Sequence, residues 1–559
     1  VHAQFSVQRL RFSAPDGLLV TLTLSGCRYA DLHPLPGTRR LLAVREDHRD
    51  AGVPPSNTVV LLDLDLPGKD RVLHDGSDFV ASPRVSADGR RVACVRWNHP
   101  AMPCDGTELC VADFAPDLKP DGALDWQVVA GGPAESVLEP QWGADGALYF
   151  RSDRSGWWNL YRWRAGAGVE ALTQLVTDLG EAPWQLGQSS YVLMDRQRVL
   201  LCLNDAGWQT LHLLDLGSGR LQPVPLPHVG ISHLGRLDAE RVFAIGTPVD
   251  GPSELLTLDL RDGRHQVIRR SGDAVLDPAA VSRPRPVRFA TQPGPDGAPR
   301  QSQAWYYPPL LPGHRVPDGE RVPLMVVLHG GPTSCSGPAF RAGVQFWTSR
   351  GFAVVDINYG GSTGFGRAWR ERLAGQWGVV DLADAVAAVD HLVATEGVDP
   401  ARVVIRGGSA GGFTVLRALA FTDRFAAGLN YFGVSDLETL ARDTHKFESR
   451  YLDRLVAPLP QGQAVYRERS PVGHMAEGRG ALLTLQGGDD RVVPPQQSRA
   501  IVDEARAVGR TVAYVEFEGE AHGFRRADSL VRALQLELAF LGRVFGFQPA
   551  DAVPPIDLG

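Results

Sequence analysis

Residues 402–413 are Arg402-Val403-Val404-Ile405-Arg406-Gly407-Gly408-Ser409-Ala410-Gly411-Gly412-Phe413. This stretch predicts a buried strand, a tight glycine turn and then a helix. A serine at the tip of such a turn is lifted out of the backbone, and only small neighbours fit because the turn is strained. The pattern is the nucleophile elbow G-x-S-x-G. It leaves the amide of Ala410 free to bind a developing oxyanion.

A second match to the pattern lies at Gly360-Gly361-Ser362-Thr363-Gly364. A strand-like run at 352–357 precedes it, but further glycines follow and no helix begins at once. Ser409 has a strand directly before it and a helix directly after it. Context therefore favours Ser409 as the nucleophile.

Strands and helices alternate on both sides of this elbow. Residues 324–328 and 352–357 are continuous apolar runs, which are typical of strands buried on both faces. Residues 381–396 carry apolar side chains at helical spacing, and Gly397 ends that helix. Leu530, Leu534, Leu538 and Leu541 predict one apolar face of a last helix. This alternation predicts a mostly parallel, doubly wound sheet, the α/β-hydrolase fold, over residues 283–559.

An acid and a base follow two later strands. The candidate acid lies in Gln486-Gly487-Gly488-Asp489-Asp490-Arg491-Val492-Val493-Pro494, and the candidate base is His522. The chain order Ser409, Asp489, His522 is that of α/β-hydrolases. A serine hydroxyl needs an imidazole to remove its proton, and a carboxylate holds that imidazole in the required tautomer.

The second oxyanion donor is predicted in His329-Gly330-Gly331-Pro332, directly after the first long buried strand. Glycines at this position let backbone amides approach the substrate oxygen. We favour the amide of Gly331, with Gly330 as the alternative, acting beside that of Ala410.

Short strands with similar ends recur through the first half of the chain. The ends fall at Asp63, Asp113, Trp163, Asp215 and Asp259, at intervals of 44 to 52 residues. A four-stranded unit repeated at this period predicts a β-propeller of six or seven blades over residues 1–282. A pair of β-sandwiches is disfavoured by the near-constant period. A proline-rich stretch at 277–323 places the domain boundary near 283.

Composition excludes several classes of protein. The net charge is −7 with 22% charged residues, which argues against binding to nucleic acid or to an anionic membrane. No apolar run has the length of a membrane span. The six cysteines form no C-x-x-C, so we expect reduced thiols and a cytoplasmic protein, although Cys104 and Cys110 could pair in an oxidising compartment. No zinc spacing occurs, and no metal or cofactor is expected.

These motifs resemble the prolyl oligopeptidase family of serine peptidases, especially its acylaminoacyl-peptidase-like and aminopeptidase-like branches. The resemblance covers nearly the whole chain and is carried by residues 329–332, 358–366, 407–412, 489–494 and 522–524. It implies that Asp489, not Asp490, is the triad acid and that Ser362 is a structural loop residue. It further implies that Arg491 binds a substrate carbonyl and that Val492 and Phe447 line the primary pocket.

The predicted activity is hydrolysis of short peptides near the N-terminus, with the propeller excluding folded proteins. The alternatives are an esterase or amidase acting on small molecules, an endo-acting oligopeptidase, and a binding protein with a vestigial hydrolase. A homo-oligomer is left open. Dipeptidyl peptidases hold a free amine with paired acids, and this chain offers no confident match; the candidates are Glu46, Asp47, Asp105, Glu108 and Glu135.

Overall fold

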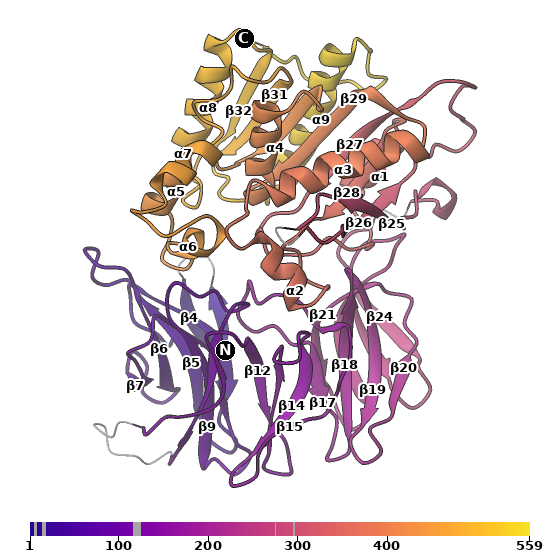
Figure 1. Cartoon of the computed structure of the whole chain (residues 1–559). Coiled ribbons are helices and arrows are strands. Elements are labelled where there is room, and N and C mark those ends of the chain that lie inside the picture. The colour runs from indigo at the N-terminus through magenta and orange to yellow at the C-terminus, as the bar shows by residue number, and fades with distance from the viewer. Residues whose placement is uncertain (5–7, 14–17, 116–123, 274–275, 295–296, 559) are drawn as a thin grey trace.

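The computed structural model describes residues 1–4, 8–13, 18–115, 124–273, 276–294 and 297–558. Six antiparallel sheets fill the first half of the chain and form the six-bladed β-propeller below the second half in Figure 1. The first three blades are β1 (His2–Gln4), β2 (Arg9–Ser13) and β3 (Leu19–Thr21); β4 (Cys27–Pro34), β5 (Arg40–Asp47), β6 (Ser56–Asp63) and β7 (Asp70–His74); and β8 (Phe79–Val85), β9 (Arg91–Trp97), β10 (Thr107–Asp113) and β11 (Gln127–Gly132).

The remaining three blades have four or five antiparallel strands. They are β12 (Val137–Trp142), β13 (Leu148–Ser152), β14 (Asn159–Arg164) and β15 (Gly168–Ala171); β16 (Asp178–Leu179), β17 (Tyr191–Leu193), β18 (Arg198–Asp205), β19 (Trp208–Asp215) and β20 (Leu221–Val224); and β21 (Gly230–Arg236), β22 (Arg241–Thr247), β23 (Glu254–Asp259) and β24 (His265–Arg270). The recurrent Asp-Gly turns join neighbouring strands, as at Gly89 and Gly146, whose φ angles of 71° and 75° suit glycine. The propeller prediction is confirmed, with six blades.

A single eight-stranded sheet forms the centre of the second half. Its order is β25-β26-β28-β27-β29-β30-β31-β32, antiparallel at β25 and β26 and parallel from β28 onward. The strands are β25 (Arg285–Thr291), β26 (Arg300–Tyr307), β27 (Val322–Leu328), β28 (Ala353–Asn358), β29 (Val398–Gly408), β30 (Ala427–Tyr431), β31 (Ala481–Gly487) and β32 (Val512–Phe517). The α/β-hydrolase prediction is confirmed.

Helices cover both faces of this sheet. Helices α1 (Ala342–Thr348) and α9 (Ala527–Phe545) pack on one face, and α3 (Val380–Thr395), α4 (Ala410–Phe421) and α8 (Pro495–Ala507) pack on the other. Shorter helices are α2 (Arg367–Arg370), α5 (Leu437–Asp443), α6 (Tyr451–Leu455) and α7 (Gln463–Arg469), with 3₁₀ turns at Pro278–Ala280 and Glu371–Leu373. Leu530, expected on the apolar face of the last helix, is 48% exposed, because the buried face is formed by side chains such as Ala533, Leu536 and Phe540.

The loop after β28 joins the two halves of the molecule. The buried carboxylate of Asp178 accepts hydrogen bonds from the amides of Gly364 and Gly366 at 3.1 Å, and Asp153 forms ion pairs with Arg367 and Arg370. The catalytic-side loops and the propeller are therefore held together by buried polar contacts. Among the described residues, no helix combines the length and apolar character that crossing a bilayer requires.

Candidate active site

Ser409 lies at the tip of the turn between β29 and α4. Its backbone is held at φ 54° and ψ −119°, a conformation that non-glycine residues rarely adopt. A Cβ on Gly407 would lie 2.5 Å from the carbonyl oxygen of Gly411, and one on Gly411 would lie 2.4 Å from that of Leu328. Larger residues cannot occupy these positions without moving the backbone. The local sequence thus produces the strained turn that exposes Ser409.

A chain of hydrogen bonds connects three side chains at the carboxyl ends of the strands. His522 Nε2 lies 2.9 Å from Ser409 Oγ, and His522 Nδ1 lies 2.8 Å from Asp490 Oδ2. Because a carboxylate only accepts, Nδ1 carries the proton and Nε2 is left to accept from the serine hydroxyl. This arrangement can activate Ser409 as a nucleophile.

The prediction that Asp489 is the triad acid is wrong, because the carboxylate that contacts His522 is that of Asp490. The backbone amide of Asp489 donates to the carbonyl of Glu520 at 2.9 Å, and the residue is exposed. Asp490, the next residue, faces inward and its side chain is fully buried. Its second oxygen accepts the amides of Val492 and Val493 at 2.8 and 3.0 Å, so the carboxylate that reaches His522 is held on both sides.

Unpaired backbone amides lie near Ser409. Within the described residues, the amides of Gly330, Gly331 and Ala410 donate to no protein acceptor, so Gly330 stays open as the alternative to Gly331. A Cβ on Gly330 would lie 3.3 Å from Gly408 O and 3.6 Å from Ser409 Cβ, so this loop passes directly beside the nucleophile. The geometry is compatible with the predicted pair of donors.

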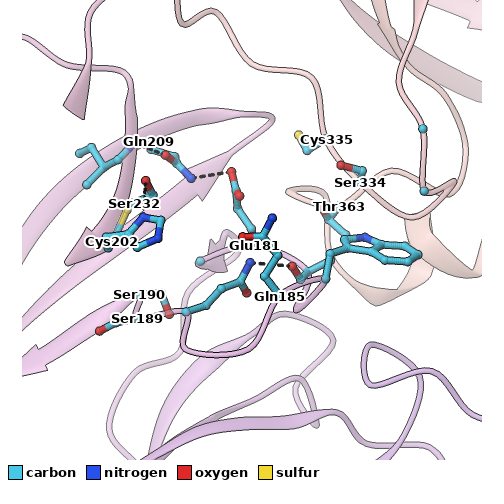
Figure 2. A pocket seen from close by; sticks show the side chains of 18 of the residues that line it. Glu181, Gln185, Ser189, Ser190, Cys202, Gln209, Ser232, Ser334, Cys335 and Thr363 are labelled. Atoms are coloured by element: carbon cyan, nitrogen blue, oxygen red, sulfur yellow. Dashed lines mark hydrogen bonds between the residues drawn. The ribbon is translucent and has the colours of Figure 1, made fainter. Parts of the chain in front are cut away.

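A cavity of about 740 Å³ opens onto Ser409 between the two halves of the molecule. Figure 2 shows its labelled lining, with Glu181 and Cys202 from the propeller facing Cys335 and Thr363 from the hydrolase half. Phe432, which also lines the cavity, packs on the His522 ring at 4.8 Å between centroids. The reacting groups are therefore reached through a shared, partly enclosed space.

The charged lining of this cavity is acidic. It includes Glu139, Glu181 and Glu448 and, among the described residues, no lysine or arginine. Glu139 pairs with Arg151 behind the wall at 3.0 Å, and Glu181 accepts a hydrogen bond from Gln209 at 2.7 Å (Figure 2). Burial raises the pKa of Glu181, opposed by Arg151 and Gln209, and burial also raises the pKa of Glu448, opposed by His445 and His522. A cationic ligand group would favour the charged form of these carboxylates further.

The residues predicted to bind substrate do not line this cavity. Phe447 packs in an aromatic cluster with Phe79 at 5.6 Å and with Trp184 at 6.2 Å, so it contacts the cavity wall from behind. Arg491 is exposed, and Val492 is half-buried against the hydrolase core. The substrate-binding roles of these three residues stay predictions.

The acidic residues considered for a free amine are engaged elsewhere. Each lies in an ion pair outside the cavity lining, as with Glu135 and Arg154 at 2.9 Å; the others are Glu46, Asp47, Asp105 and Glu108. Sequence reasoning missed Glu181 and Glu448. No local pattern marks either residue, because each reaches the cavity only when the two halves are assembled.

Several proteins of known family resemble this chain. A model described as "Prolyl oligopeptidase family" matches residues 338–548. A solved Mycobacterium tuberculosis puromycin-hydrolyzing peptidase is 38% identical, with 99% of this chain and 85% of that one covered and a TM-score of 0.93. A mutant puromycin hydrolase complexed with PGG is 34% identical, with 100% and 86% covered and a TM-score of 0.92.

Two curated relatives match this chain over shorter regions. The dipeptidyl aminopeptidase BIII of Pseudoxanthomonas mexicana is 32% identical over 231 residues, which are 40% of this chain and 34% of that protein. An acylamino-acid-releasing enzyme of Arabidopsis thaliana is 29% identical over 38% of this chain and 29% of its own length. The match thus spans about a third of these curated relatives.

Proposed function

Since this chain belongs to the prolyl oligopeptidase family, we propose that it is a serine peptidase that hydrolyses short peptides. The observation that carries the proposal is the hydrogen-bond chain from Ser409 through His522 to Asp490, which opens onto the cavity shared with the propeller. The two halves would act as separate domains, a propeller at 1–282 and a catalytic domain at 283–559.

The proposed reaction follows from the positions of these atoms. Ser409 Oγ attacks the scissile carbonyl while His522 Nε2 takes its proton, and Asp490 stabilises the imidazolium through Nδ1. The carbonyl oxygen becomes an oxyanion that accepts from the amides of Gly331 and Ala410. His522 then gives its proton to the leaving amine, which departs as the acyl-enzyme forms. A water molecule, deprotonated by His522, releases the acyl group and restores Ser409.

We propose that the preferred substrates carry a free N-terminal amine. The carboxylates of Glu181 and Glu448 line the cavity without a lysine or arginine on the described lining, so a bound ammonium would compensate them. An acetylated terminus carries no charge and offers no such compensation. This arrangement favours release of residues from the N-terminus over release of acylated amino acids.

Replacing Glu181 by glutamine should lower kcat/KM for a free-amine peptide by about 10- to 100-fold, since a charged hydrogen bond contributes about 1.5–3 kcal/mol. The same peptide with an acetylated terminus should be affected much less. Glu135→Gln is the matched control, because Glu135 pairs with Arg154 away from the cavity. Equal losses on both peptides would mean that Glu181 stabilises the cavity wall and does not bind the amine.

A substrate panel tests the function as a whole. It contains free and acetylated short peptides, an internally quenched peptide blocked at both ends, a small ester, and puromycin, which two structural relatives are described as hydrolysing. We expect turnover of the free peptides and of puromycin and its loss in Ser409→Ala. Turnover of the ester alone would favour the esterase alternative, and cleavage of the blocked peptide would favour the endo-acting one.

We also propose a cytoplasmic location. All six cysteines are free thiols, including Cys104 and Cys110, and five of the six are buried. Thiols kept in the reduced form are typical of a reducing compartment. Fractionation of the native cells with detection of the full chain would test this location.

A further inference from the structure

A short turn of the hydrolase half, residues 445–449, contacts the propeller beside the catalytic cavity. The turn lies between α5 and α6. It is closed by a hydrogen bond from the amide of Glu448 to His445 O at 3.1 Å and by one from Ser449 Oγ to Lys446 O at 2.8 Å. Its side chains therefore extend from a compact backbone toward the other half of the molecule.

Lys446 binds two blades of the propeller at once. Its ammonium group donates to Pro55 O at 2.9 Å and to Asn57 Oδ1 at 3.0 Å in the second blade. It also donates to Asp78 O at 2.6 Å, next to the first strand of the third blade. These bonds use all three donors of the ammonium group, and all three acceptors are neutral oxygens. The placement of the ammonium, rather than a pairing of charges, thus holds the turn.

Phe447 is a second anchor for the same turn. Its ring meets those of Phe79 and Trp97 in the third blade edge-on, at 5.6 and 6.5 Å between centroids. It also meets the ring of Trp184, from the fifth blade, at 6.2 Å. Edge-to-face contacts of this kind are favourable for aromatic rings. Two consecutive side chains of the turn are therefore fixed to the propeller.

Glu448 follows these two anchors and lines the catalytic cavity together with Ser409 and His522. On its other side, its carbonyl oxygen accepts from the amide of Tyr451 at 2.9 Å. The Tyr451 hydroxyl in turn lies 2.6 Å from Thr333 Oγ1. Glu448 is thus held between an anchor on the propeller and an anchor on a loop of the hydrolase half.

The carboxylate of Glu448 is available to a ligand. Within the part of the chain that the structure describes, its one ion pair is with His445, at 3.7 Å, and it accepts no hydrogen bond. The carboxylate of Glu181, in contrast, accepts from Gln209 at 2.7 Å. Burial raises the pKa of Glu448, opposed by His445 and His522, so a bound cation would favour its charged form.

We propose that Lys446 is a positioning residue for substrate selection, which holds the Glu448 carboxylate where the ammonium group of the substrate binds. This proposal rests on the proposed peptidase function and its preference for a free amine. Lys446 does not line the cavity and would act only through the turn. The amine site is then completed by docking of the two halves, because the acceptors of Lys446 belong to the propeller.

Kinetics of two variants test the proposal. Glu448→Gln should raise KM for a free-amine peptide by about 10- to 100-fold, since it removes a charged hydrogen bond. Lys446→Met keeps the length of the side chain without its donors and should raise this KM by about 3- to 10-fold, because the carboxylate is displaced but still present. In both variants kcat should change little, since the amine is bound alike before and during the reaction. The acetylated peptide should keep its kcat and KM.

Arg454 supplies the matched control. It also reaches from the hydrolase half to the propeller, where its Nε lies 3.3 Å from Asp105 Oδ1, and it does not line the cavity. Arg454→Met removes this contact and should leave the ratio of KM for the free and acetylated peptides unchanged. The same change of ratio in Arg454→Met as in Lys446→Met would indicate general loosening of the interface and would overturn the proposal.

A double variant determines whether Lys446 acts through Glu448. If it does, adding Lys446→Met to Glu448→Gln should raise KM no further, because the two residues then act as one unit. A further increase in the double variant would overturn the proposal. So would an unchanged KM for the free-amine peptide in Lys446→Met, or an equal change for both peptides.

Two further points keep the outcome decisive. If Lys446→Met does not fold, Phe447→Leu loosens the same turn and is compared in the same way. Wild-type protein that hydrolyses no peptide, or that hydrolyses acetylated peptides as well as free ones, would instead reject the proposed function. The two failures are therefore distinguishable.

Discussion

Replacing Asp490 by asparagine should lower kcat by about 10,000-fold, the scale of the loss when a triad carboxylate becomes an amide. Asp490 is the fully buried carboxylate that accepts from His522 Nδ1. An amide at this position no longer selects the tautomer in which Nε2 accepts from Ser409. Asparagine keeps an oxygen for the amides of Val492 and Val493, so the loop should stay folded.

The neighbouring residue supplies the matched control for this experiment. Asp489→Asn should leave kcat close to the wild-type value, because the exposed Asp489 carboxylate makes no contact with His522. Steady-state kinetics on one peptide and a thermal melt of each variant complete the comparison. A large loss in Asp489→Asn with an active Asp490→Asn would assign the triad acid to Asp489 after all.

Ser409→Ala should lower kcat by about a million-fold, the scale found when a triad nucleophile is removed. The hydroxyl that His522 deprotonates is then absent and no acyl-enzyme can form. The melting temperature should change little, since alanine occupies the same turn. Ser362→Ala is the comparison, with a loss of about tenfold or less, and equal losses in the two variants would contradict the assignment of Ser409.

Much of the fold could be predicted because its signals are local. The apolar runs at 324–328 and 352–357 became the adjacent parallel strands β27 and β28, and the helix expected at 381–396 is α3. The last helix was predicted less well. Its pattern predicts Leu530 on the buried face. The rotation of the helix about its own axis is set by packing against the sheet, and it leaves Leu530 exposed.

The triad acid could not be read from the motif because two aspartates are adjacent. The Asp490 side chain faces inward and contacts His522, and the Asp489 amide donates to Glu520 O; both contacts join loops about 31 residues apart. The structure separates them, because the amides of Val492 and Val493 cap the Asp490 carboxylate; the sequence offers Asp489 amides at the same spacing.

The cavity depends on contacts that no local pattern contains. Glu181 comes from the propeller and Glu448 from the hydrolase half, and both line the space around Ser409. The hydrogen bond between His329 and Ser362, at 2.7 Å, likewise joins loops that are separate in the sequence. Residues that act across an interface are identified only when the two surfaces are seen together.

If Ser409 is the activated nucleophile, it should react covalently with a fluorophosphonate. The wild-type protein would be treated with a fluorophosphonate, digested, and the modified peptide sequenced by mass spectrometry. We predict one adduct, on Ser409, which is absent from Ser409→Ala and slowed in Asp490→Asn but not in Asp489→Asn. An adduct on Ser362, or no adduct on the folded wild-type protein, would contradict the account.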